Sequence, residues 1–146
     1  IKGAGCVTHF WCTISNTDPN YLRKLVLRVY WDGEEYPSIE VPIGDFFGMG
    51  HAMSKNYWSM PLSMSPKDGK GFNCFFPMPF SQGARIEVEN ENDVEIVWYY
   101  YIDYEEHRIS ERCFIVLADS GGLLDVPCLE EGERTDTDKD GQRNMV

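Results

Sequence analysis

Alternating apolar and polar side chains mark much of this chain as β-strand. Residues 25–31 repeat with a period of two, which is typical of a strand with one buried face. The apolar positions of that run are Leu25, Leu27, Val29 and Trp31. The run stops at Asp32-Gly33, a strong hairpin signal, so residues 36–41 are predicted to return as its partner strand.

Further strands are predicted over residues 7–14, 71–80, 85–89 and 94–104. Pro77 and Pro79 cannot donate backbone hydrogen bonds, so they should confine the end of their strand to a sheet edge or loop. Residues 18–24 alone favour a helical turn. Short strands joined by Gly, Pro and Asn turns predict a single all-β domain, an antiparallel jelly-roll β-sandwich with little helix. Its core should contain Leu25, Leu27, Val29, Ile86, Val88, Ile96 and Trp98.

The pattern changes towards the end of the chain. A length of 146 residues suits one domain, and we expect the sandwich to span residues 1–117. Residues 118–146 form a divergent acidic tail that we expect to be poorly ordered, because it has few groups to bury. Its run Asp136–Gly141 matches the opening of a calcium loop, although a solvated tail explains the same residues.

Charge and cysteine content narrow the range of partners. A net charge of −11 argues against nucleic acid and against anionic membrane surfaces as partners. The five cysteines lack a CxxC pair, and several have apolar neighbours, so we expect reduced structural thiols and no zinc site. His9 and His51 are not spaced as a metal pair. We therefore expect no metal and no cofactor.

Three blocks mix large aromatic residues with glycine or proline and a few polar groups: residues 44–51, 71–80 and 99–106. Such strand ends and loops offer flat rings and hydrogen-bonding groups to a polar, ring-shaped ligand such as a sugar. An aromatic-rich sandwich core would produce the same composition. The sequence predicts five binding residues: Trp11, Asp45, Phe46, His51 and Asn73.

Each of these residues also has a structural explanation. Asp45 could accept hydrogen bonds from sugar hydroxyls or cap a turn, and Trp11 and Phe46 could stack on a sugar or pack in the core. His51 could contact a sugar or be an ordinary loop histidine. Asn73 lies on an apolar strand and must find partners, either in a neighbouring loop or in a ligand.

Five blocks in order resemble a known family. They are Ile1–Trp11, Leu22–Glu35, Val41–His51 (with Gly-Asp-Phe-Phe-Gly-Met-Gly-His), Gly71–Phe80 and Tyr99–Glu106. Over about residues 1–108 the chain closely resembles glycoside hydrolase family 172, long catalogued as domain of unknown function 2961. The resemblance implies the first of two jelly rolls, assembly into trimers or larger oligomers, and a furanoside substrate such as difructose dianhydride or a D-arabinofuranoside.

The resemblance also implies that the catalytic glutamates belong to the second jelly roll, whose motifs are not found in this sequence. Because neighbouring strand residues face opposite ways, neither Glu34/Glu35 nor Glu105/Glu106 can be a facing carboxylate pair. We therefore expect this chain to bind a furanoside without hydrolysing it. The alternative is a non-catalytic, self-assembling structural subunit, whose loop methionines and Trp58 would provide adaptable interface surface.

Overall fold

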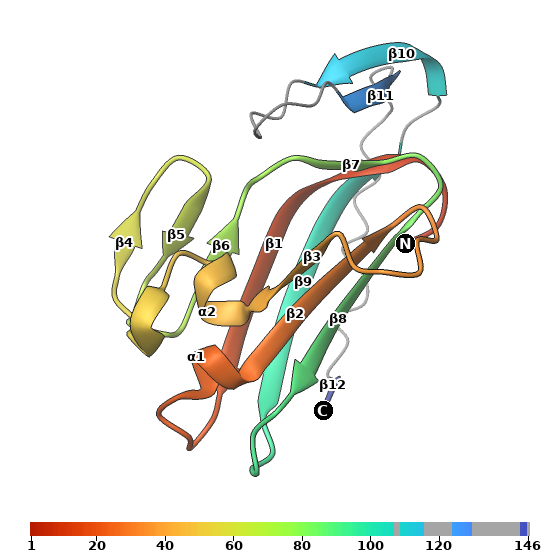
Figure 1. Ribbon diagram of the computed structural model, residues 1–146. Coiled ribbons are helices and arrows are strands. Elements are labelled where there is room, and N and C mark those ends of the chain that lie inside the picture. Colours follow the sequence, from red (N-terminus) through yellow and green to blue (C-terminus); the bar gives the residue numbers. More distant parts are fainter. Residues whose placement is uncertain (107–108, 116–123, 130–143, 146) are drawn as a thin grey trace.

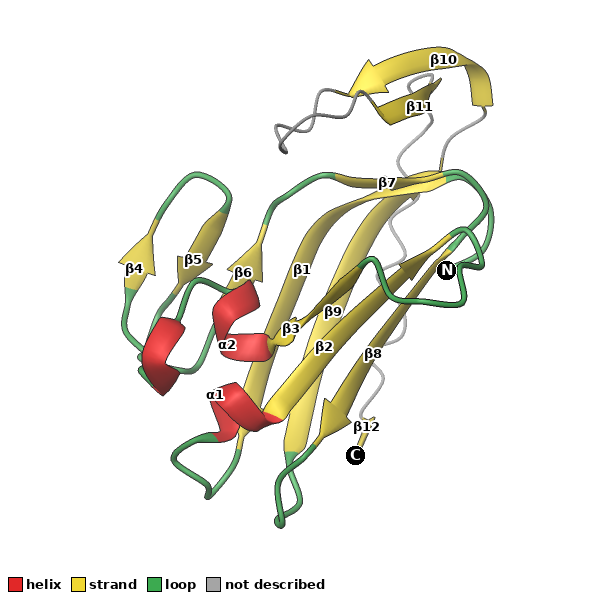
Figure 2. Cartoon of the chain, viewed as in Figure 1, coloured by secondary structure: helices red, strands yellow, loops and turns green. Residues whose placement is uncertain are grey.

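The computed structural model describes residues 1–106, 109–115, 124–129 and 144–145, with side chains for residues 1–106. Two antiparallel sheets pack face to face and a separate hairpin follows (Figures 1 and 2). The strands are β1 (Gly5–Ser15), β2 (Leu25–Trp31), β3 (Ile39–Pro42), β4 (Tyr57–Trp58), β5 (Leu62–Met64), β6 (Phe72–Cys74), β7 (Met78–Phe80), β8 (Ala84–Asn90), β9 (Val97–Glu106), β10 (Ile109–Ile115), β11 (Leu124–Leu129) and β12 (Asn144–Met145). The helical segments are α1 (Tyr21–Lys24), α2 (Ile43–Phe46) and the 3₁₀ turn η1 (Gly50–Ala52).

Strand β1 organises the larger, seven-stranded sheet. The order is β12-β9-β1-β6-β5-β4, and β7 also pairs with β1. β9 lies along β1 from Gly5 to Ser15, while β6 and β7 share the opposite edge of β1. Pro79 lies in β7, which pairs with β1 alone among the described strands, so the predicted edge position of this proline is confirmed.

The register of β1 shifts once. Val7 pairs with Tyr104 and His9 with Asp103, so Thr8 is an extra residue in β1. Before this bulge Gly5 and Val7 are buried, and after it the buried positions are Phe10, Cys12 and Ile14. His9 and Trp11 therefore lie on the face of the sheet that points away from the core.

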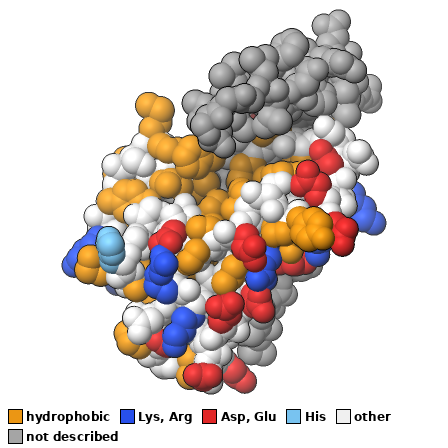
Figure 3. Space-filling model, in the orientation of Figure 1, with side chains coloured by type: hydrophobic (Ala, Val, Ile, Leu, Met, Phe, Trp, Pro, Cys, Tyr) orange, Lys and Arg blue, Asp and Glu red, His pale blue; other side chains and the backbone are white. Residues whose placement is uncertain are grey.

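The smaller sheet has the order β3-β2-β8. Its inner face carries Leu25, Leu27 and Val29, all fully buried. On its outer face the Arg28 guanidinium bonds to Glu40 at 2.7 Å on β3 and to Glu89 at 2.5 Å on β8. Figure 3 shows charged side chains of both signs over the three-stranded sheet, whereas apolar side chains gather over β4–β6.

The core fills the space between the two sheets. Phe10 and Cys12 of β1 and Phe72 of β6 pack in one cluster with the inner face of β2. Five of the seven predicted core residues are buried: Leu25, Leu27, Val29, Ile96 and Trp98. Ile86 and Val88 are half-buried and pack against the cluster from β8, at the edge of the small sheet. The expected all-β antiparallel sandwich with little helix is therefore confirmed.

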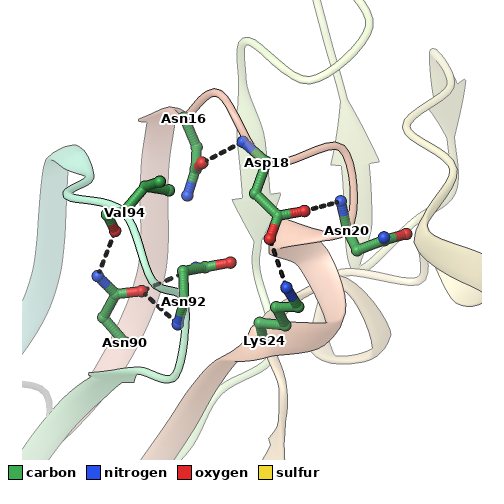
Figure 4. A network of polar contacts seen from close by, with 7 residues as sticks. All are labelled: Asn16, Asp18, Asn20, Lys24, Asn90, Asn92 and Val94. Atoms are coloured by element: carbon green, nitrogen blue, oxygen red, sulfur yellow. Dashed lines mark hydrogen bonds and ion pairs between the residues drawn. The ribbon is translucent and has the colours of Figure 1, made fainter.

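Hydrogen bonds to two aspartate side chains connect the loops at the two ends of the sandwich. Asp32 Oδ1 accepts hydrogen bonds from the backbone N–H groups of Ser81, Gln82 and Gly83 at 2.8, 2.6 and 3.2 Å, which ties the β2–β3 turn to the start of β8. Figure 4 shows the other end, where the Asp18 carboxylate accepts from Lys24 Nζ at 2.5 Å and from the Asn20 N–H at 2.7 Å. Asn90 and Asn92 of the β8–β9 turn lie beside this group.

Some loop predictions need refinement. The predicted helical turn is confirmed as α1, but the segment expected to be a glycine-rich loop also contains α2 and η1. Of the methionines considered as interface residues, Met49, Met64 and Met78 are buried, and Met64 and Met78 lie in β5 and β7 rather than in loops, whereas Met53 and Met60 are exposed. Cys6, Cys12 and Cys74 are free thiols. The boundary at residue 117 and the calcium-like run lie outside the described residues.

No helix in the described part of the chain is both long and apolar enough to cross a membrane.

Candidate functional site

A row of five side chains crosses the outer face of the larger sheet. Antiparallel pairing aligns Trp58 with Ser63, Ser63 with Asn73, Asn73 with Trp11, and Trp11 with Tyr101. Residues directly opposite each other in an antiparallel sheet point to the same face. The row therefore runs from β4 through β5, β6 and β1 to β9, and we call it the outer row.

The positions on either side of the outer row point inwards. On one side, Phe10 pairs with Cys74 and with Ile102, and all three belong to or pack against the core. The strand alternation therefore separates a buried face from a face rich in aromatic and polar groups. Trp58 and Tyr101 are 78% and 57% exposed, and Trp11 and Asn73 are half-buried.

His9 lies beside the outer row, between Asn73 of that row and Asp103 of β9. Its Nδ1 lies 3.0 Å from Asp103 Oδ2, and its Nε2 lies 3.2 Å from Asn73 Oδ1. The amide of Asn73 is oriented by its Nδ2, which donates to the Gly71 carbonyl at 3.1 Å. Both ring nitrogens therefore face an oxygen acceptor, and the position of the ring hydrogens decides which of the two bonds His9 makes.

Aromatic rings complete this face. The Phe75 ring stacks on His9 with a centroid distance of 4.4 Å and an interplanar angle of 3°. The ring centroids of Trp11 and Tyr101 lie 5.3 Å apart across the β1–β9 pair. The result is a surface where flat apolar rings lie next to an imidazole, an amide and a carboxylate. This combination is suited to a ligand that has both C–H faces and hydrogen-bonding groups.

The segment Ile43–Ala52 holds the other predicted binding residues. Asp45, on α2, is ion-paired with Arg23 of α1, so its carboxylate joins the two helical turns. The Phe46 ring packs against Phe10, on the inner side of the larger sheet. His51 is exposed and has a φ of 62°, in the left-handed region that side chains other than glycine rarely adopt.

A family model described as GH172 domain-like matches residues 1–98. The chain belongs to this family. The match covers two thirds of the 146 residues, includes β1–β8 and ends at the second residue of β9. It confirms the resemblance to glycoside hydrolase family 172 over that range. No curated protein matches the chain.

In this GH172 domain-like chain the five predicted binding residues lie in two places. Trp11 and Asn73 are paired on the outer face, and Asp45, Phe46 and His51 lie on α2 and η1.

Sequence reasoning did not select His9, Asp103 or Tyr101 as site residues. Their signal was present in the alternation of β1 and β9, which places His9 and Trp11 on one face and Tyr101 and Asp103 on one face. Tyr101 and Asp103 also lie beyond the residues that the GH172 domain-like model matches.

The described thiols are not suited to nucleophilic chemistry. Burial raises the pKa of the Cys12 thiol to about 12, and it also raises the pKa of Cys74. Burial, together with the nearby Glu105, raises the pKa of Cys6 as well. A thiol with a raised pKa holds little of the reactive thiolate at neutral pH. Within the part of the chain whose structure is described, no three His, Cys, Asp or Glu side chains are grouped to hold a metal ion.

Proposed function

We propose that this chain is the first jelly-roll domain of a furanoside-directed glycoside hydrolase and that it supplies substrate contacts rather than the catalytic carboxylates. The proposed substrate class, of the difructose dianhydride or D-arabinofuranoside type, is the one that the family resemblance implies. The observation that carries the proposal is the outer face itself, where Trp11 lies in register between Asn73 and Tyr101 with His9 beside it.

The chemistry of this face fits sugar binding. A furanose ring has apolar C–H faces that pack on the Trp11 ring, and hydroxyl groups that exchange hydrogen bonds with Asn73, His9 and Asp103. His9 lies within hydrogen-bond distance of both Asp103 and Asn73, and the Asn73 amide also donates to the Gly71 carbonyl, so these polar groups are positioned before a ligand arrives. Such preorganisation lowers the entropic cost of binding.

The carboxylates of this face support a binding role. The family resemblance implies hydrolysis with retention of configuration, and retaining glycosidases place two carboxyl groups about 5–5.5 Å apart. Asp103 and Glu105 are alternate residues of one strand, and the rise of a strand separates such positions by about 7 Å. Asp103 is also bonded to His9. We therefore assign the hydrolytic pair to a second domain of the parent protein.

Calorimetric titration of the 146-residue chain tests the proposal. A D-arabinofuranosyl disaccharide or difructose dianhydride should bind, and Trp11→Ala should raise its Kd about tenfold or more. If Trp11→Ala folds poorly, Tyr101→Ala serves as the second variant, because its position is more exposed, and it should also raise the Kd. Tyr36→Ala, an exposed aromatic outside the outer face, is the matched control and should leave Kd unchanged. Failure of both sugars to bind would refute the proposal.

The non-catalytic part of the proposal has its own test. The chain should release no product from an aryl arabinofuranoside or an aryl fructofuranoside. Robust turnover that Asp45→Asn abolishes would instead identify a catalytic site near α2.

A second candidate function is self-assembly. Met60 and Trp58 are 95% and 78% exposed at the β4–β5 hairpin, and such apolar surface is typical of interfaces between chains. In place of sugar binding, this candidate predicts a homo-oligomer, a trimer or larger, that covers this surface. Size-exclusion chromatography with light scattering tests it. An oligomer without sugar affinity would favour a structural subunit over the glycosidase domain, and a monodisperse monomer would remove this candidate.

A further inference from the structure

The outer row extends well beyond the surroundings of His9. It crosses five adjacent strands, and a spacing of about 4.8 Å between neighbouring strands gives it a length of roughly 19 Å. Trp58 lies at one end, Trp11 near the other, and Tyr101 at the far end beside Trp11. This length exceeds a single furanose ring and accommodates several linked rings.

We infer that the outer row is an extended platform that binds several consecutive sugar units of a neutral, linear glycan, with Trp58 holding a unit remote from Trp11. This inference rests on the proposed sugar-binding function of the same face and names the form of ligand that it takes.

Exposure supports a ligand contact at the remote end. Trp58 is 78% exposed, although an indole ring is among the most favourable side chains to bury. The residue beside it in the row, Ser63, is small and only 2% exposed. Trp58 therefore stands apart from the Trp11–Tyr101 pair, with the smaller side chains of Ser63 and Asn73 between them.

Charge narrows the class of ligand. All five residues of the outer row are uncharged, and the chain has a net charge of −11. Nucleic acids and anionic polysaccharides require basic groups along their path, which this row does not provide. The polar groups closest to the row, His9 and Asp103, can exchange hydrogen bonds with hydroxyl groups. A neutral glycan therefore fits better than a polyanion.

The polar content of the face also favours a glycan over a second copy of the chain. The centre of a protein–protein interface is depleted of charged groups, yet the Asp103 side chain next to this row is 65% exposed. Its carboxylate would lose water on contact with an apolar partner surface. A glycan can return those hydrogen bonds through its hydroxyl groups.

A comparison of ligand lengths tests the inference on the full 146-residue chain. A D-arabinofuranosyl hexasaccharide should bind at least tenfold more tightly than the disaccharide of the same linkage. Trp58→Ala should remove that advantage and leave the disaccharide Kd unchanged, whereas Trp58→Phe, which keeps a ring, should retain it. Tyr36→Ala is again the control, and circular dichroism verifies that each variant is folded.

The outcomes separate the two proposals. Equal Kd values for disaccharide and hexasaccharide, or a hexasaccharide advantage that survives Trp58→Ala, would overturn the platform and leave the proposed function standing. Binding of neither sugar would refute the proposed function and the platform together. If the chain is an oligomer that Trp58→Ala converts to a monomer, a second copy covers this face, and the platform is overturned.

Discussion

At the residue scale, single side chains hold separate parts of the fold together. Asp32 is the clearest case, because one carboxylate oxygen accepts from three successive backbone N–H groups. The residue itself has a φ of 53°, and the following Gly33 has a φ of 81°, which gives the tight turn needed between β2 and β3. The Asp-Gly signal in the sequence predicted this turn, but not the connection to residues 81–83.

Replacing Asp32 with alanine should lower the free energy of unfolding by about 2 kcal/mol, because hydrogen bonds to charged groups contribute about 1.5–3 kcal/mol each and water replaces part of the loss. Urea denaturation measures the change. Glu35→Ala, an exposed acidic residue of the neighbouring loop, is the control. A loss below about 0.5 kcal/mol, the range of ordinary surface substitutions, would show that the carboxylate does not hold the turn.

A second prediction at this scale concerns Asp18. Its hydrogen bonds to Lys24 and to the Asn20 N–H lower the pKa of its carboxyl from the ordinary value of 3.8. A lowered pKa means that Asp18 contributes stability above that ordinary value and loses it as the pH falls through the folded-state pKa. The difference in urea midpoint between the native chain and Asp18→Asn should therefore be largest near neutral pH and should vanish in acid. A difference that is independent of pH would contradict this assignment.

At the element scale, β1 and β9 determine most of the architecture. Their strands were predictable because both segments are rich in aromatic and β-branched residues, and β2 was predictable from its period of two. The short helix α2 was not, because four residues that include Gly44 carry no helical period. β3 begins only at Ile39, since the residues after the Asp-Gly turn form a loop before pairing resumes.

The candidate site could be predicted only in part, for a related reason. Trp11 and Asn73 stood out as unusual residues on their strands. Their neighbours His9, Asp103 and Tyr101 are informative only once the register is known, and the register joins residues 94 positions apart in the chain. Side-chain alternation predicts the face of a strand, but not which strand lies beside it.

Gly71 provides a prediction about the connection between β5 and β6. A Cβ at this position would lie 1.8 Å from the Ser65 carbonyl oxygen, and the Gly71 carbonyl orients Asn73. Gly71→Ala should therefore lower the free energy of unfolding by about 1–3 kcal/mol or more and disturb the His9–Asn73 contact. Gly50→Ala is the matched control, because nothing lies within 4 Å of its Cβ position. Thermal unfolding and the NMR shifts of the His9 ring measure both effects, and equal behaviour of the two variants would contradict the prediction.

At the scale of the whole molecule, the part of the buried core that the structure describes comes from the first two thirds of the chain. The buried apolar residues of the described part all lie between Val7 and Trp98, and the family match ends at residue 98. The remainder of β9 still pairs with β1 along its length. The core and the pairing of β1 should therefore be complete without the residues that follow the predicted domain boundary.

A chain shortened to residues 1–117 should keep a β-type circular dichroism spectrum and unfold in one cooperative transition. A chain shortened to residues 1–96 should not fold, because it lacks β9, the partner of β1 on one edge, together with the core residue Trp98. Loss of the cooperative transition in the longer of these two chains would show that residues 118–146 belong to the folding unit.

The extra residue Thr8 in β1 has a consequence for how this sequence can vary. Upstream of it the odd-numbered positions face the core, and downstream the even-numbered positions do. The alternation of core-facing positions in β1 therefore changes from odd to even numbers, and the one extra residue, Thr8, produces that change. A deletion at position 8 would remove the bulge and keep Val7 on the core side and the His9–Trp11 pair on the outer side, because Val7 and His9 already pair with the successive residues Tyr104 and Asp103. In an alignment of relatives, a one-residue gap at position 8 is therefore compatible with an unchanged outer face, whereas a one-residue gap elsewhere in β1 would shift one part of the strand relative to the other.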